Sequence, residues 1–225
     1  MFRELTIIAI CCGEENKLDR RTLNLVLASF IAAPATLAGI SGPLRAETSV
    51  DVAAALAPRY LGSEDAPLTM IEYFSLTCGA CGKFHREILP TIKEKYIDTG
   101  KLRMEYRDFP LDIWALRAAA MARSAPAKRY DALITVLYDQ QPRWTRADDV
   151  LAALKQIGRL AGLSSSYIQT AMMNTELLDG IANSRLVANR DLDVQSTPTF
   201  LIGDRKLNGF LPLDEFDALL AEMTG

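Results

Sequence analysis

Two cysteines separated by two residues are the clearest candidates for chemistry in this sequence. Cys78 and Cys81 follow an apolar segment that predicts a buried strand, and they open a segment with helical character. The first turn of a helix offers unpaired N–H groups and the positive end of the helix dipole, which stabilise a thiolate. We therefore predict thiol–disulfide exchange in which Cys78, at the helix tip, is the nucleophile and leaving group. Cys81, about one turn later and shielded, can close a disulfide or release a mixed disulfide trapped at Cys78.

Two other uses of the cysteine pair stay open. One is an inert disulfide, although a position at the start of a helix favours a reactive pair. The other is a zinc site shared with His85. That histidine is the sole one in the chain, and zinc sites usually have three or four protein ligands. We expect the chemistry to need no metal and no organic cofactor.

Glu72 and His85 are further candidate site residues. Glu72 lies inside the predicted strand ahead of the cysteines, where an unpaired carboxyl group is costly to bury. It could move protons for Cys81, and the alternative is a solvated or salt-bridged strand residue. His85 follows Cys81 on the same helical face. It is a candidate for tuning a thiol, although an ordinary packed or surface histidine is the favoured interpretation.

A second candidate segment, Thr197–Pro198, precedes the third predicted strand. A proline at this position suggests a turn or a cis peptide bond, because proline cannot donate a hydrogen bond within a central sheet. If the segment lies near Cys78, it could leave a backbone edge free to bind an extended peptide by strand addition. We therefore treat Thr197 and Pro198 as candidate substrate-binding residues.

The order of the predicted elements indicates an α/β fold. A strand–helix–strand unit and a later strand–strand–helix unit build one central sheet with helices on its faces. A helical block separates the two units as an insertion. Pro90 predicts a kink in the first helix after its first turns, and Gly100 ends that helix. The predicted strands are 68–75, 102–109, 199–202 and 206–208, and the predicted helices are 78–98, 112–124, 127–140, 146–161, 164–174, 176–190 and 213–223.

Residues 1–46 are predicted to be a leader. An uncharged and largely apolar run follows Arg20 and Arg21, and Ala46 offers a small residue for cleavage. This pattern is typical of a secretory signal peptide, and the arginine pair also resembles a twin-arginine export signal. An uncleaved anchor helix is the alternative. We expect export and cleavage.

The extreme N-terminus fits a signal peptide poorly. Residues 1–17 include an apolar stretch with Cys11 and Cys12, and signal peptides rarely carry such an extension. One hypothesis is that these residues are not translated, because a rare TTG start codon could encode Leu18. In either case both cysteines leave with the leader, and Cys78 and Cys81 remain.

The rest of the chain divides into four predicted parts. Residues 47–66 are an N-terminal lead-in, with a short amphipathic segment and then a stretch punctuated by Pro, Gly and Asp. Residues 67–111 form the first half of the α/β domain, 112–191 the helical insertion, and 192–225 the second half.

Composition excludes several classes of protein. The 225 residues are 49% hydrophobic and 24% charged, which fits a globular protein and neither a disordered chain nor a polytopic membrane protein. The chain has 25 Lys and Arg against 28 Asp and Glu, for a net charge of −3. Such a balance gives no basic surface for nucleic acid. No segment indicates dimerisation, so we expect a monomer.

Taken together, these motifs resemble the thioredoxin superfamily and, more closely, the DsbA-like thiol–disulfide oxidoreductases of bacterial envelopes. The resemblance implies a thioredoxin fold interrupted by a helical domain. It implies that Cys78 is the nucleophile and Cys81 the resolving thiol. It also implies that Glu72 is a buried proton carrier and Thr197–Pro198 a cis-proline substrate loop. The motifs that carry it are Glu72–Ser75, Cys78–Cys81, Phe84–His85, Leu89–Pro90, Tyr106–Leu111 and Thr197–Phe200.

The dipeptide between the cysteines departs from the family pattern. Many DsbA-like proteins carry Pro-His there, whereas this chain has Gly79 and Ala80. Without the histidine, one contact that stabilises the Cys78 thiolate is absent. We therefore predict a weaker oxidant than the Pro-His members.

The resemblance also implies a function and a location. We expect a periplasmic, exported oxidase that passes its disulfide to reduced or misoxidised substrate proteins. A quinone-linked membrane partner would reoxidise it. A reductase or isomerase of the same fold is the alternative, and a non-catalytic metal- or peptide-binding module is a more distant one.

Overall fold

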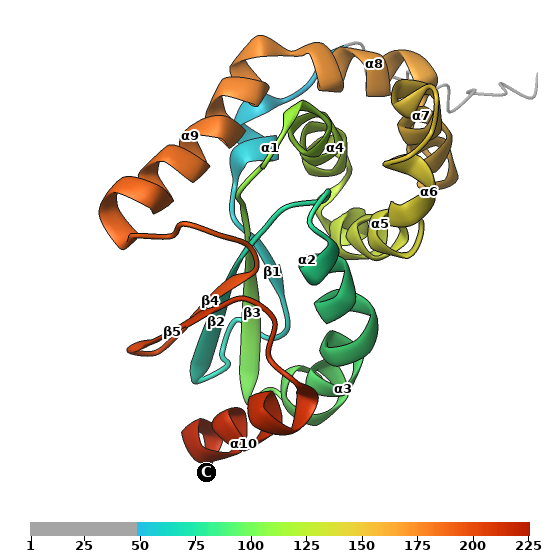
Figure 1. Ribbon diagram of the computed structural model, residues 1–225. Coiled ribbons are helices and arrows are strands. Elements are labelled where there is room, and N and C mark those ends of the chain that lie inside the picture. The colour runs from blue at the N-terminus through green and yellow to red at the C-terminus, as the bar shows by residue number, and fades with distance from the viewer. Residues whose placement is uncertain (1–48) are drawn as a thin grey trace, which may run out of the picture. The chain divides into compact units, whose positions relative to one another are not determined.

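A five-stranded mixed sheet forms the centre of the protein (Figure 1). The computed structural model describes residues 49–225, and the predicted leader lies outside them. The strand order is β1-β3-β2-β4-β5, with β2 and β3 parallel and the other neighbours antiparallel. The two predicted units therefore share one sheet, which confirms the predicted α/β fold. The strands are β1 Arg59–Leu61, β2 Leu68–Phe74, β3 Leu102–Asp108, β4 Thr199–Ile202 and β5 Arg205–Asn208.

The central position of β2 follows from its sequence. The strand is an almost continuous apolar run, as expected where both faces of a sheet are covered, and Met70 and Phe74 are buried. The exception is Glu72, which lies in register with Tyr106 of β3 and Phe200 of β4. This carboxyl group therefore sits in the middle of the sheet, shortly before the chain reaches the cysteine pair.

The helix that follows β2 alternates between α-helical and π-helical turns. Pro90, where the sequence predicts a kink, lies in its third segment, directly after a π-helical turn. π-Helical turns inside α-helices often occur at functional sites. Gly100 has a φ of +75° just beyond the end of the helix, a backbone conformation that favours glycine. The segments are α2 Gly79–Lys83, η1 Phe84–Ile88, α3 Leu89–Ile92 and η2 Lys93–Ile97.

The segment between β3 and β4 is helical, as predicted. In Figure 1, α4 to α8 gather beyond the end of the sheet at which β2 finishes, and α10 lies at the opposite end, beside α3. Within residues 49–225, no helix combines the length and apolarity needed to cross a membrane. The helices are α4 Ile113–Ser124, α5 Ala127–Asp139, α6 Gln141–Trp144, α7 Val150–Leu160, α8 Ser165–Met173, α9 Thr175–Leu192 and α10 Leu213–Thr224.

One strand of the sheet was not predicted from the sequence. β1 lies in the stretch 47–66, after the short helix α1, Val52–Leu56, and pairs antiparallel with β3 at the edge of the sheet. The predicted amphipathic segment corresponds to α1, whose N-cap is Asp51. The stretch therefore contributes both a helix and an edge strand.

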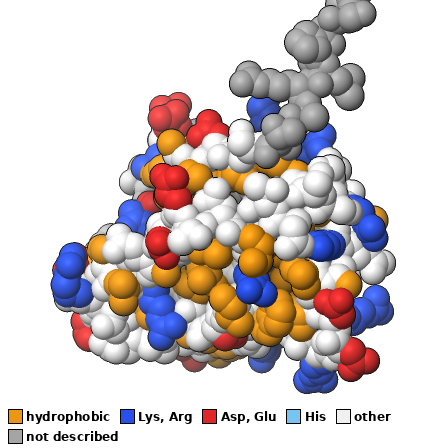
Figure 2. All heavy atoms as spheres, turned by 90° about the horizontal axis from the view of Figure 1, so that it is seen from above, with side chains coloured by type: hydrophobic (Ala, Val, Ile, Leu, Met, Phe, Trp, Pro, Cys, Tyr) orange, Lys and Arg blue, Asp and Glu red, His pale blue; other side chains and the backbone are white. Residues whose placement is uncertain are grey.

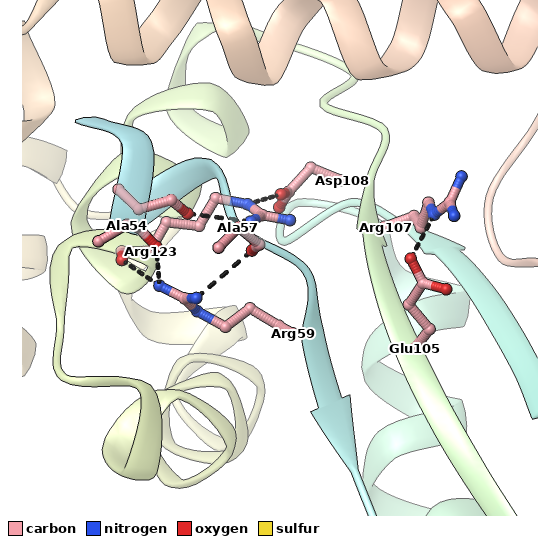
Figure 3. Close-up of polar contacts among 8 residues, drawn as sticks. Ala54, Ala57, Arg59, Glu105, Arg107, Asp108 and Arg123 are labelled. Carbon is pink, nitrogen blue, oxygen red and sulfur yellow. Dashed lines mark hydrogen bonds and ion pairs between the residues drawn. The ribbon is translucent and has the colours of Figure 1, made fainter. Parts of the chain in front are cut away.

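Two buried arginines hold α1 and β1 against the sheet (Figure 3). The guanidinium of Arg59 donates a hydrogen bond to the carbonyl of Ala54 at 3.0 Å. Arg123 donates to the carbonyl of Ala57 at 3.2 Å and forms an ion pair with Asp108. The last carbonyl groups of a helix have no partner within it, and these arginines supply one. The cluster explains how the N-terminal segment is anchored.

Candidate active site

Cys78 begins the helix that follows the central strand. It is the N-cap residue of α2, with φ −74° and ψ 119°, and its Sγ accepts a hydrogen bond from the backbone N–H of Cys81 at 3.4 Å. Cys78 is half-buried, whereas Cys81 is fully buried, and both thiols are free. The predicted arrangement of an accessible sulfur at the helix tip and a shielded one behind it is present in the structure.

The Thr197–Pro198 segment lies directly against Cys78, although 119 residues separate them in sequence. The peptide bond between Thr197 and Pro198 is cis, which confirms one of the two expected conformations. The Cys78 thiol donates a hydrogen bond to the Thr197 carbonyl oxygen at 3.3 Å. The fold therefore brings both cysteines and this loop together at one end of the sheet.

The pKa values of the two thiols are shifted in opposite directions. The pKa of Cys78 is lowered to about 6, mainly by a hydrogen bond from the Cys81 side chain. The N–H groups of the first helical turn add to this effect, and partial burial opposes it. Burial raises the pKa of Cys81 well above its usual range, and Cys78 and the charge of Glu72 raise it further. Near neutral pH, Cys78 is therefore a thiolate and Cys81 a thiol.

Glu72 and His85 form a buried pair behind the cysteines. Nε2 of His85 lies 2.9 Å from Oε2 of Glu72, and both side chains are almost completely shielded from solvent. The second carboxyl oxygen, Oε1, is buried and has no hydrogen-bond partner among residues 49–225. The structure thus places His85 as a packed histidine and Glu72 as a core residue with His85 as its hydrogen-bond partner.

The helical block supports the active-site turn through residues that sequence reasoning missed. Nε2 of Gln141 donates hydrogen bonds to the carbonyl oxygens of Leu76, at 2.8 Å, and Cys78, at 2.9 Å. The hydroxyl of Tyr138 donates to the carbonyl of Ser75 at 3.2 Å. The carbonyl groups of Ser75 and Cys78 also accept backbone hydrogen bonds, from the N–H groups of Cys78 and Gly82, so the block adds a second donor to each of them and supplies the side-chain donor of Leu76.

A glycine in α2 makes room for the glutamine. A Cβ atom added to Gly82 would lie 2.4 Å from Oε1 of Gln141. A Cβ atom added to Gly79 would meet nothing within 4 Å. Gly82 was therefore a sequence signal for close approach by another element, although not for its identity. Gly79 is exposed and Ala80 half-buried, and neither has a polar side chain that could bind the Cys78 sulfur.

The turn after β3 is also tied to the active-site turn. Thr77 donates a hydrogen bond from its hydroxyl to Oδ2 of Asp112 at 2.6 Å. Oδ1 of the same carboxylate accepts from the backbone N–H groups of Trp114 and Ala115, so Asp112 is also the N-cap of α4. This residue therefore links the helical block to the turn that carries Cys78.

An open groove of about 520 Å³ adjoins this turn. It lies between the start of α4 and α9, and Leu111, Ile113 and Leu186 in its lining are exposed. Figure 2 shows the molecule from above. Hydrophobic side chains cluster on the face seen there, with basic side chains among them. Exposed apolar surface of this kind often marks contact with another molecule. Within residues 49–225, no group of three or more His, Cys, Asp or Glu side chains is arranged to hold a metal ion.

Comparison with known proteins agrees with this geometry. A family model described as Thioredoxin matches residues 55–222. The chain belongs to this thioredoxin family. A crystal structure of alpha-DsbA1 from Wolbachia pipientis superposes with a TM-score of 0.69 and 31% sequence identity, covering 75% of this chain and 91% of that one. The predicted thioredoxin fold and the DsbA-like resemblance are therefore confirmed.

Curated relatives carry related names. The chain is 31% identical over 144 residues to a Rickettsia typhi protein with a protein-disulfide oxidoreductase name, an alignment over 63% of this chain and 53% of that protein. It is 27% identical over 164 residues to Disulfide bond formation protein D of Bacillus subtilis, covering 69% and 72% of the two chains. The chain spans about half the length of the Rickettsia relative that it matches.

Proposed function

We propose that this protein is a thiol–disulfide oxidoreductase that donates a Cys78–Cys81 disulfide to reduced substrate proteins. The observation that carries the proposal is the opposite acidity of the two thiols, with the pKa of Cys78 lowered to about 6 and that of Cys81 raised. A stabilised thiolate favours the reduced form of the pair, and a pair with a stable reduced form oxidises other thiols. The names of the relatives support the same chemistry.

The reaction takes place in two exchange steps. A substrate thiolate attacks Sγ of Cys78, the bond to Cys81 breaks, and the electron pair of that bond stays on the Cys81 sulfur, which takes up a proton. A second substrate thiolate then attacks the substrate sulfur of the mixed disulfide. The Cys78 thiolate leaves, and the substrate keeps the new disulfide. The low pKa of Cys78 makes it the better leaving group in this last step.

The other site residues receive roles from their positions. Glu72, close enough to influence the acidity of Cys81, carries the proton of that thiol. Thr197 and Pro198 lie beside the reactive sulfur and hold the backbone of an extended substrate segment. The apolar groove along α9 supports contact with unfolded proteins, which expose apolar side chains.

Location and partners follow from the same proposal. Disulfide formation requires an oxidising compartment, and the N-terminal sequence pattern favours export to the bacterial envelope. The reduced enzyme must be reoxidised after each cycle, for which we propose a membrane redox partner. We propose that the protein acts as a monomer.

A reductase or isomerase is the second candidate, and the Gly79–Ala80 dipeptide favours it. No polar side chain between the cysteines adds to the hydrogen bonds that stabilise the Cys78 thiolate. The potential is therefore expected to lie below that of members with Pro-His between their cysteines. A non-catalytic binding module is a third candidate. It predicts peptide binding or retention of metal after dialysis, without any thiol exchange.

The reduction potential of the Cys78–Cys81 pair tests the proposal. The protein is equilibrated in glutathione buffers, with the Cys78→Ser variant as the control that cannot form the disulfide. A potential near −120 mV supports an oxidase, whereas one near −270 mV supports a reductase, and the proposed weak oxidant lies between about these values. Oxidation of a reduced two-cysteine peptide, measured at the same time, would be absent for a binding module.

A further inference from the structure

The buried Glu72–His85 pair supports an inference about proton transfer, which rests on the exchange reaction proposed above. Nε2 of His85 lies 2.9 Å from Oε2 of Glu72, and the side chains are 3% and 0% exposed. Oε1 of the same carboxyl group is buried, and no residue in the described part of the chain forms a hydrogen bond with it. A buried carboxyl oxygen without a partner is costly, so its persistence calls for an explanation in terms of function.

Aromatic rings hold the imidazole of His85 in place. The ring stacks on Tyr138 at a centroid distance of 4.2 Å and, more distantly, on Tyr106 at 6.0 Å. The edge of the neighbouring Phe84 ring packs against it at 5.5 Å. A ring packed in this way has little freedom to turn, so its hydrogen bond fixes the carboxyl group of Glu72. One carboxyl oxygen is thereby occupied and the other is left free.

Cys81 is the group near Glu72 whose proton must move during exchange. It lies four residues before His85 in the same helix, and Nε2 of His85 is 2.9 Å from Glu72. Burial and then Cys78 raise the pKa of this thiol, and the charge of Glu72 acts in the same direction. The other titratable groups that interact with Glu72 are Tyr106 from β3 and Tyr130 and Tyr138 from α5. Burial raises the pKa of each of these tyrosines, so they keep their protons at neutral pH.

We propose that His85 is a positioning residue that orients Glu72 so that Oε1 exchanges a proton with the Cys81 thiol. His85 donates from Nε2 to Oε2 throughout. When a substrate thiolate breaks the disulfide, the Cys81 sulfur keeps the electron pair and takes the proton from Oε1. In the reverse direction Oε1 takes the proton from Cys81, whose thiolate attacks Sγ of Cys78 in the mixed disulfide and releases the substrate thiolate. Solvent restores the proton balance of Glu72.

The reverse step can be measured in isolation. Protein whose Cys78 carries glutathione as a mixed disulfide is prepared at low pH. Release of glutathione after a pH jump reports attack by Cys81, and the rate is recorded between about pH 5 and about pH 9. The absorbance of the Cys78 thiolate, recorded separately in each reduced variant, shows whether a substitution has also disturbed the outer sulfur.

Substitutions at the two positions separate orientation from packing. Glu72→Gln is expected to slow glutathione release about 100-fold near neutral pH, the range typical of a lost general base. His85→Phe keeps a ring in the same place but removes the donor, and we expect about a tenfold loss with the same change of pH profile. His85→Gln can still donate to Oε2 and is expected to keep the wild-type profile. The double variant Glu72→Gln/His85→Phe should be no slower than Glu72→Gln, because the two residues act as a unit.

Several results would overturn the inference. One is a folded His85→Phe protein with the wild-type pH profile, and another is additive slowing in the double variant. If His85→Phe is too unstable to purify, His85→Gln decides, because a profile like that of Glu72→Gln contradicts a positioning role. Different results would contradict the proposed function. A protein that does not oxidise peptides but releases glutathione as described would contradict the oxidase proposal alone, and normal peptide oxidation with unchanged release in Glu72→Gln would contradict only this inference.

Discussion

The two sulfurs of the Cys78–Cys81 pair lie three residues apart, yet their surroundings differ in kind. The outer sulfur receives hydrogen bonds from Cys81 and from the first turn of α2, and its pKa falls to about 6. The inner sulfur is enclosed by the core, and burial, then Cys78 and the charge of Glu72, raise its pKa. The helix N-terminus alone cannot produce this difference, because both cysteines belong to the same turn. What covers each sulfur decides which thiol leaves and which one holds a proton.

Removing each sulfur in turn tests most strongly whether the two cysteines have different roles. Cys78→Ser is expected to abolish disulfide exchange, because the nucleophile is lost. Cys81→Ser should still react once and then remain trapped as a mixed disulfide, because no resolving thiol is present. The intact mass of the protein after incubation with an oxidised peptide distinguishes the two. Trapping in Cys78→Ser instead of Cys81→Ser would reverse the assigned roles.

Support of the outer sulfur by the helical block can be tested at Gln141. Gln141→Leu removes the side-chain donor of the Leu76 carbonyl and the second donor of the Cys78 carbonyl, and we expect a loss of about 2 kcal/mol in the free energy of unfolding. Denaturant unfolding measures this change. Gln156→Leu is the matched control, because Gln156 is an exposed glutamine on α7. Equal effects of the two substitutions would mean that the bridging hydrogen bonds contribute nothing.

The pH dependence of the reduction potential tests whether the pKa of Cys78 is lowered. The lowered pKa of Cys78 stabilises the reduced protein at pH values above about 6, and this stabilisation is lost as the pH falls through that value. Above it, two electrons are accompanied by one proton, so the potential should fall by about 30 mV per pH unit. Below it, two protons are taken up, and the slope should be about 59 mV. A slope of about 59 mV that continues to pH 8 would contradict the assignment.

Alanine substitutions at the two glycines of α2 are expected to change stability the least. A side chain at Gly82 collides with Gln141, whereas Gly79 faces open space. Gly82→Ala is therefore expected to cost about 1 kcal/mol of stability, because Gln141 must give up part of its hydrogen bonding. Gly79→Ala should be neutral or stabilising by up to about 1 kcal/mol, because alanine favours a helix. Thermal unfolding of the pair tests this, and a more stable Gly82→Ala protein would argue against a fixed Gln141.

Much of the fold could be predicted from local sequence patterns. β2 was found because it is an almost continuous apolar run, and β3 because apolar and polar residues alternate along it. β1 could not be found in this way, because Arg59–Leu61 is a three-residue edge strand whose formation depends on pairing with β3. The helix predicted at 146–161 begins later, at Val150, where Asp149 provides the N-cap. α6, Gln141–Trp144, was missed because Pro142 indicated a break, although proline is tolerated in the first turn of a helix.

In the candidate site, too, some residues could be predicted from local sequence and others depend on tertiary packing. The spacing of Cys78 and Cys81 predicted their placement at the start of a helix, because the relevant geometry is local. The partner of Glu72 was not identified, because the pairing with His85 depends on how α2 and η1 pack on the sheet. Gln141 carries no motif, and its bonds to the active-site turn arise from the packing of the helical block. Sequence patterns thus located the reacting atoms, and tertiary packing supplied the groups that control them.

The opposite acidity of the two thiols is tested most directly by the ultraviolet absorbance of the thiolate in the reduced protein. A single thiolate is expected to appear with a midpoint near pH 6. The titration should persist in Cys81→Ser, whose hydroxyl can still donate to the outer sulfur, and should vanish in Cys78→Ser. An ordinary cysteine titrates near pH 9, and a midpoint there would contradict the difference between the two thiols on which the proposed function rests. A titration that vanishes in Cys81→Ser alone would contradict it as well.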